Sequence, residues 1–87
     1  MAPYRVTLEF QQPGGPPTQA ASEHLLERLR AAAPEADVAL ELGIGRLHAG
    51  LTILAQGPDE AVDRAVAASR EVFARPATRI DVASAEA

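Results

Sequence analysis

Apolar and polar residues alternate along four segments of the chain. In residues 4–10, for example, Tyr4, Val6, Leu8 and Phe10 alternate with polar side chains. An alternation with a period of two is typical of a strand that buries one face. The pattern therefore predicts four half-buried strands, at residues 4–10, 36–42, 47–55 and 78–82.

Two other segments carry apolar residues at the spacing of a helix. The first covers residues 19–33, where Thr18 is suited to cap the start and Pro34 to stop the end. The second begins near Pro58, which suits a first helical turn, and stops before Pro76. Each helix is expected to bury one stripe against the sheet. The predicted stripes are Ala21, Leu25, Leu29 and Ala32 in the first helix, and Val62, Ala65, Val66, Ser69, Val72 and Phe73 in the second.

Residues 43–46 are predicted to form the turn between the second and third strands. A four-residue loop in this place gives a hairpin in which both strands turn their apolar residues to the same face. A slip by one residue would send one of the two apolar sets into water, so the register is well specified. The predicted cross-strand pairs are Leu42–Leu47, Leu40–Ala49 and Val38–Leu51.

The predicted elements run strand, helix, strand, strand, helix, strand. Right-handed crossovers then give an antiparallel sheet of strand order 4-1-3-2 with both helices on one face. This α+β two-layer sandwich resembles the ferredoxin-like superfold over residues 4–82. One such domain is expected to fill residues 1–87, with an ordered core over about residues 4–83. The resemblance implies no particular function, because this superfold hosts many unrelated activities.

Composition removes several kinds of chemistry. The 87 residues include no Cys, so disulfides, thiolate metal sites and Cys nucleophiles are excluded. His24 has only Glu23 and Glu27 beside it as candidate ligands, so no metal site is expected. The net charge is −4 without a basic face, which argues against nucleic acid. No segment has the length of a membrane span or a signal peptide, so we expect no membrane partner and a cytoplasmic location. We also expect no cofactor.

The open face of the predicted sheet carries the first candidate site. Its centre is small, with Thr7, Gly50 and Thr52 as candidate ligand-binding residues, and a glycine inside a strand often marks a close approach. On the same face, His48 falls opposite Glu41 in the hairpin, and such a pair can act as acid or base. The alternative is a solvated polar face, which antiparallel sheets commonly have.

The loop after the first strand carries the second candidate site. Its Pro13-Gly14 step is similar to the one in ACT domains, small regulatory modules that bind amino acids at dimer interfaces. The resemblance implies ligand binding near Gly14 and Gly15. In this chain the loop is longer and richer in proline, and Gln12 stands where that family commonly has an acidic residue. The alternative is a turn that only connects two elements.

Two functions follow as hypotheses. The first is a non-enzymatic module that forms a homodimer through the open sheet face or a sheet edge, and works through protein contacts or a weakly specified small ligand. The second is a cofactor-free enzyme of the dimeric α/β-barrel kind, of the monooxygenase, cyclase or isomerase class. In that enzyme His48 would transfer the proton, Glu41 would assist it, and Thr7 and Thr52 would line the pocket. A cavity of several hundred cubic ångströms beside His48 would favour the enzyme.

Overall fold

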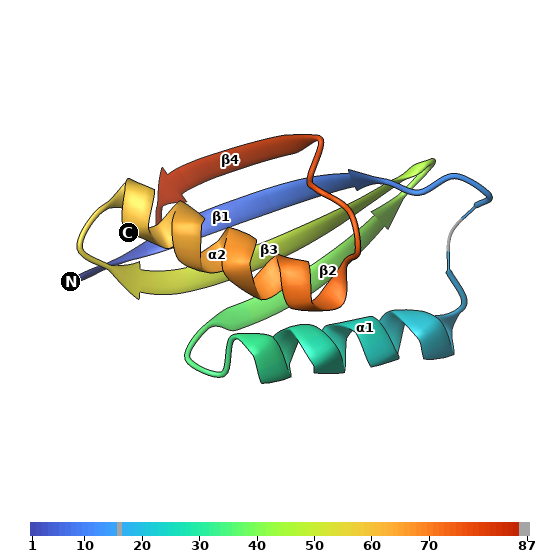
Figure 1. Ribbon diagram of the computed structural model, residues 1–87, viewed down its shortest axis with the longest axis horizontal. Helices are drawn as coiled ribbons and strands as arrows, with labels where there is room; N and C mark the ends of the chain where they lie inside the picture. Colours follow the sequence, from blue (N-terminus) through green and yellow to red (C-terminus); the bar gives the residue numbers. More distant parts are fainter. Residues whose placement is uncertain (16, 86–87) are drawn as a thin grey trace.

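Four antiparallel strands form one sheet in the order β2-β3-β1-β4, which confirms the predicted strand order (Figure 1). The computed structural model describes residues 1–15 and 17–85. Pro16, in the loop after the first strand, and residues 86–87, at the end of the predicted domain, lie outside the described residues. The strands are β1 (Ala2–Gln11), β2 (Asp37–Gly43), β3 (Arg46–Ala55) and β4 (Arg79–Ser84). The longest two, β1 and β3, lie in the centre, so β2 and β4 form the edges.

The alternation of side chains places the core on one face of the sheet. On β1, Val6, Leu8 and Phe10 are completely buried. Their cross-strand partners on β3 are Leu51, Ala49 and Leu47, and these are completely buried as well. The predicted period of two is therefore confirmed for both central strands, each of which has a neighbouring strand on either side.

The hairpin of β2 and β3 has the predicted register with a tighter turn. Leu42 pairs with Leu47, and the ladder continues to a further pair between Gly43 and Arg46. Only two residues, Ile44 and Gly45, are left for the turn, rather than the predicted four. Gly45 has a φ of +69°, a left-handed conformation that glycine adopts without the steric cost that a side chain would bring.

Both helices begin as the sequence predicts. In α1 (Gln19–Ala32), Thr18 Oγ1 accepts a hydrogen bond of 3.1 Å from the backbone N–H of Ala21. This bond satisfies one of the N–H groups that a helix start leaves without a partner. In α2 (Pro58–Val72), Pro58 occupies the first turn, where its missing N–H costs nothing. In Figure 1 α2 crosses in front of the strands and α1 lies below them, beside β2. The two helices pack against each other on the face that carries the core.

The two helices contribute unequally to the core. In α2 the completely or almost completely buried residues are Ala61, Ala65, Ala68, Ser69 and Val72, while Val62 and Val66 of the predicted stripe are only partly buried. The small alanines let the helix approach the strands closely, which turns the valines to its flanks. Of the described residues of α1, Leu29 alone is fully buried, and the predicted core residue Ala21 is exposed.

The edge strand β4 departs furthest from the predicted burial. Ile80 and Val82 pair with Leu8 and Val6, so they point to the core side as predicted. Their exposed fractions are nevertheless 43% and 38%. The reason is visible in Figure 1, where β4 runs along one margin of the sheet and α1 lies at the other margin, beside β2. Of the two described helices, only α2 contacts β4. Two helices cover the centre of a four-stranded sheet better than its edges.

Candidate functional site

A shallow hollow lies at the centre of the open sheet face. It has a volume of about 170 Å³ and is lined by Arg5, Thr7, Ala39, Glu41, His48 and Gly50. These residues come from β1, β2 and β3, and they share the hollow because all of them point away from the helices. The structure thus brings together four of the predicted site residues, Thr7, Gly50, His48 and Glu41. The fifth one on this face, Thr52, pairs with Arg5 and is not part of the lining.

Gly50 is buried although it lies on the open face, because the side chain of Arg5 covers it. A Cβ added at Gly50 would lie 2.9 Å from Nη2 and 3.1 Å from Nε of Arg5. The close approach that a glycine within a strand indicates is therefore made by a residue of the same chain. This geometry accounts for Gly50 without a second copy on the open face.

The imidazole of His48 contacts a carboxylate that the hairpin pattern did not reveal. Its Nε2 lies 2.9 Å from Oε1 of Glu9, which is the neighbour of His48 on β1. Glu41 is opposite His48 on β2, as predicted, but the hydrogen bond goes to Glu9. Nη1 of Arg46 also lies 3.8 Å from the same oxygen of Glu9. The pair is partly exposed, with 32% of the His48 side chain and 23% of the Glu9 side chain accessible.

The predicted sheet order was enough to place Glu9 and His48 on neighbouring strands and on the same face. Glu9 is an outward residue of β1, and the order 4-1-3-2 makes β1 a neighbour of β3. The register between these strands, however, depends on the packing of residues 39 positions apart and not on a connecting turn. A histidine held by one carboxylate has a fixed ring orientation and can exchange a proton with a group placed in the hollow. The third group beside the pair is the exposed guanidinium of Arg46, which lies at ion-pair distance from Glu9.

The loop that resembles the ACT domain leaves its glycines open to solvent. Gly14 and Gly15 have φ values of +87° and +92°, which only glycine adopts readily, and no atom lies within 4 Å of a Cβ built on either. Gln12 anchors the loop through its backbone N–H, which donates to Gly45 O over 2.9 Å, and its Oε1, which accepts from Arg75 over 2.9 Å. A wide depression of about 450 Å³ lies beside the loop, but neither glycine lines it.

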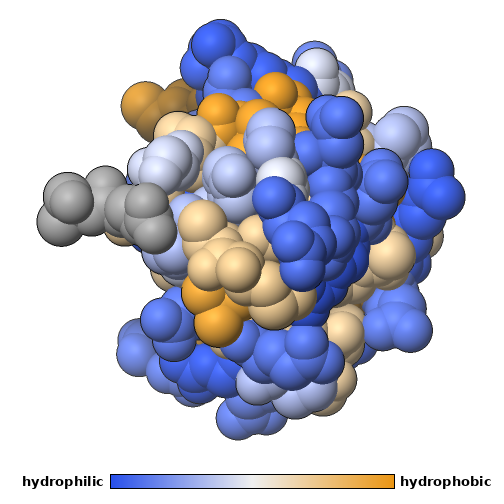
Figure 2. Space-filling view, turned by 90° about the vertical axis from the view of Figure 1, so that its left-hand side faces the viewer, coloured by the Kyte–Doolittle hydropathy of each residue, from blue (hydrophilic) through white to orange (hydrophobic). Residues whose placement is uncertain are grey.

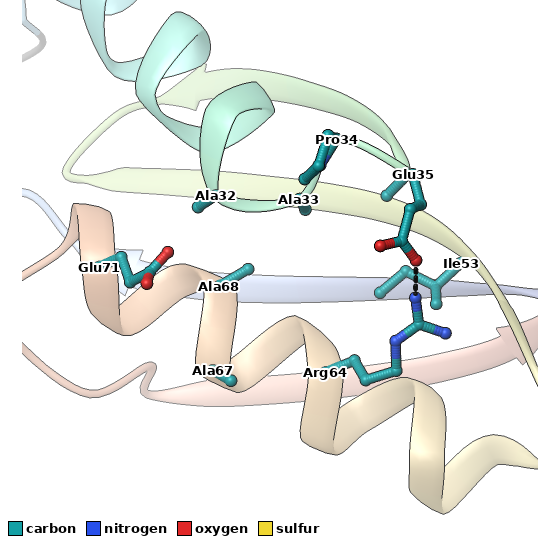
Figure 3. Close-up of a pocket in the computed structure, with 10 residues that line it drawn as sticks. Ala32, Ala33, Pro34, Glu35, Ile53, Arg64, Ala67, Ala68 and Glu71 are labelled. Carbon is teal, nitrogen blue, oxygen red and sulfur yellow. Dashed lines mark hydrogen bonds and ion pairs between the residues drawn. The ribbon is translucent and has the colours of Figure 1, made fainter.

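A further hollow of about 240 Å³ lies on the helix side, between the end of α1 and the face of α2 (Figure 3). Ala33, Ile53 and Ala68 supply apolar walls. At one end Arg64 points toward Glu35, with Nη2 2.7 Å from Oε2, and its Nη1 donates to Leu54 O over 2.6 Å. Through these contacts, which use two of the five N–H donors of the guanidinium, Arg64 joins three segments of the fold.

The described residues contain no group of three His, Asp or Glu that could hold a metal ion. His24, Glu23 and Glu27 are exposed on α1. Neither described helix has both the length and the apolarity to cross a membrane. No family model matches the chain, and comparisons with curated proteins and with solved structures gave no match.

Proposed function

We propose that this chain is a non-enzymatic module that works by self-association, and that it forms a homodimer through an edge of its sheet. The observation that carries the proposal is the exposure of Ile80 and Val82 on the edge strand β4. Both side chains point to the core side, where an apolar residue is normally covered. Proteins commonly protect such edges with short strands, prolines or covering loops, because an open edge is a template for another strand.

The open face is a poorer interface than the edge. It carries Arg5, Glu9 and His48, and Arg5 forms no ion pair with any described residue. A flat partner that covered these groups would remove water from several charges. The free-energy cost of this desolvation is recovered only where the partner supplies opposite charges in good geometry. The edge needs no such compensation, since strand pairing satisfies backbone groups and covers apolar side chains.

We also infer that the domain has the ferredoxin-like fold. This inference is supported by the element order β-α-β-β-α-β together with the sheet order β2-β3-β1-β4. The fold alone assigns no activity. It does explain why one face and two edges of the sheet are open to partners, since both helices lie on the other face.

The second candidate function is a cofactor-free enzyme, and the contact between His48 and Glu9 is the observation in its favour. In this version Glu9, rather than Glu41, would assist His48. The hollow that His48 lines is about 170 Å³, whereas pockets for small molecules usually measure about 300–1,000 Å³. Glu9 lines the wider depression of about 450 Å³, but His48 does not. We therefore rank this function second.

Light scattering coupled to size-exclusion chromatography tests the proposal. Over a series of protein concentrations, the measured mass should rise from that of one 9.1 kDa chain to twice that value. His48→Ala should leave this transition unchanged, because His48 lies on the open face and away from β4. A mass that stays at one chain up to millimolar concentration would contradict the proposal.

A further inference from the structure

We infer that two copies pair β4 with β4 in antiparallel fashion about a two-fold axis through Ile80, so that Arg79 of one copy faces Asp81 of the partner subunit. The inference rests on the proposed self-association and specifies its interface. It joins the two four-stranded sheets into one continuous sheet. Three observations lead to it, namely the backbone groups that face the edge, the charges on β4, and the charges on the opposite edge.

The hydrogen bonds between β1 and β4 determine which backbone groups face the edge. The N–H of Ala85 donates to Pro3 O over 2.9 Å, so these two residues form a hydrogen-bonded pair. In an antiparallel ladder such pairs alternate, so Asp81 and Arg79 turn their N–H and C=O groups toward β1. Ile80 and Val82 consequently turn theirs away from β1, toward the edge, where no other strand of the described residues lies.

The charges on β4 distinguish between the possible registers. Arg79 and Asp81 flank Ile80 on the open-face side, and their side chains are 70% and 61% exposed. An axis through Ile80 places each Arg79 opposite Asp81 of the partner subunit, which gives two opposite-charge pairs. An axis through Asp81 would bring two carboxylates together, and an axis through Val82 would place Asp81 opposite Ala83. Only the first register makes both charges complementary.

The apolar side chains fit the same axis. Ile80 of one copy would lie directly beside the partner's Ile80 on the helix side, where each is now 43% exposed. Val82 would extend this contact toward Thr78 of the partner subunit, through side chains only, because the N–H and hydroxyl of Thr78 both donate to Glu9 O. Figure 2 views the end of the molecule at which β4 finishes. Hydrophobic residues, in orange, are visible near the top of this view, and β4 also lies at the top in Figure 1. The pairing would remove apolar surface from water on one side and match charges on the other.

The other edge is unsuited to the same pairing. On β2 the open-face residues are Asp37, Ala39 and Glu41, which offer two acids and no base. Antiparallel pairing of β2 with its own copy would place acids opposite or near one another, and like charges in that position are destabilising. Helix α1 also packs beside β2. These features protect β2 and leave β4 as the edge that can accept a second copy.

Charge reversal tests the register. Arg79→Asp and Asp81→Arg, studied separately, should each raise the dimer dissociation constant by about tenfold or more, because both opposite-charge pairs become like-charge pairs. An equimolar mixture of the two variants should form a heterodimer with about the affinity of the original homodimer. Its masses can be followed by native mass spectrometry at low ionic strength, where exposed charges are least screened. Glu41→Arg is the matched control, an equal change of charge on the other edge.

The mixture distinguishes pairing between two copies from the loss of a contact within one chain. Arg79 Nε already lies 3.1 Å from Asp81 Oδ2 within one chain, and each variant destroys that contact. Mixing cannot restore it, so recovery of the heterodimer supports the pairing between copies. A wild-type chain that stays monomeric would overturn the proposed function itself. A wild-type dimer that ignores both reversals would overturn only this interface, and circular dichroism of each variant verifies that it is folded.

Discussion

Replacing Gly50 by alanine tests whether Arg5 alone occupies the space above this glycine. The new Cβ would lie 2.9 Å from Nη2 of Arg5, which is too close for van der Waals contact. The atoms in the way belong to the end of a long, exposed side chain that has no ion pair with the described residues. We therefore expect Arg5 to swing aside while the backbone of β3 stays in place.

The size of the effect follows from two opposing contributions. Alanine within a strand is more stable than glycine by about 0.5–1 kcal/mol, mainly because the unfolded chain has less freedom to lose. Displacing Arg5 takes away part of this gain, so Gly50→Ala should change the free energy of unfolding by less than about 0.5 kcal/mol. In an Arg5→Ala background the same substitution should stabilise the protein by the full amount of about 0.5–1 kcal/mol.

Urea denaturation of the four proteins in this double-mutant cycle measures the difference. Each protein should be measured at two concentrations, because a dimer is stabilised by mass action and a monomer is not. A loss of more than about 2 kcal/mol on Gly50→Ala in the Arg5→Ala background would refute the reasoning. It would mean that something other than Arg5 covers Gly50, as a second copy on the open face would.

Three further substitutions test the packing and the helix start. Leu29→Ala should lower the free energy of unfolding by about 2–5 kcal/mol in urea denaturation, since it empties the one fully buried position of α1; a loss below 1 kcal/mol would contradict the burial. Thr18→Ala should cost about 1 kcal/mol by removing the bond to Ala21 N–H, and Thr18→Ser should recover most of it in thermal unfolding. Phe73→Leu should lower the free energy of unfolding by at least about 0.5–1.5 kcal/mol, because the ring of Phe73 stacks on Phe10 with centroids 4.4 Å apart. In a Phe10→Leu background, calorimetry should find a smaller loss of stability from the same substitution.

The candidate site was only partly predictable. The register of the β2–β3 hairpin follows from a short turn and two alternating segments, so His48 could be placed opposite Glu41 from the sequence. The hydrogen bond between His48 and Glu9 could not, because it depends on how β1 slides along β3, and no turn connects these strands. The same holds for Arg5 above Gly50, which is a diagonal contact between the same two strands.

The sequence by itself determined the identity and order of the elements. Alternation, the cap at Thr18 and the prolines at helix ends act over a few residues, so they can be read without knowing the rest of the fold. Tertiary structure decided how fully each element is covered. Ile80 alternates like a core residue, yet it is 43% exposed, because β4 is an edge strand that α2 contacts and α1 does not. Coverage depends on the sizes of side chains in distant elements, and that property has no local pattern.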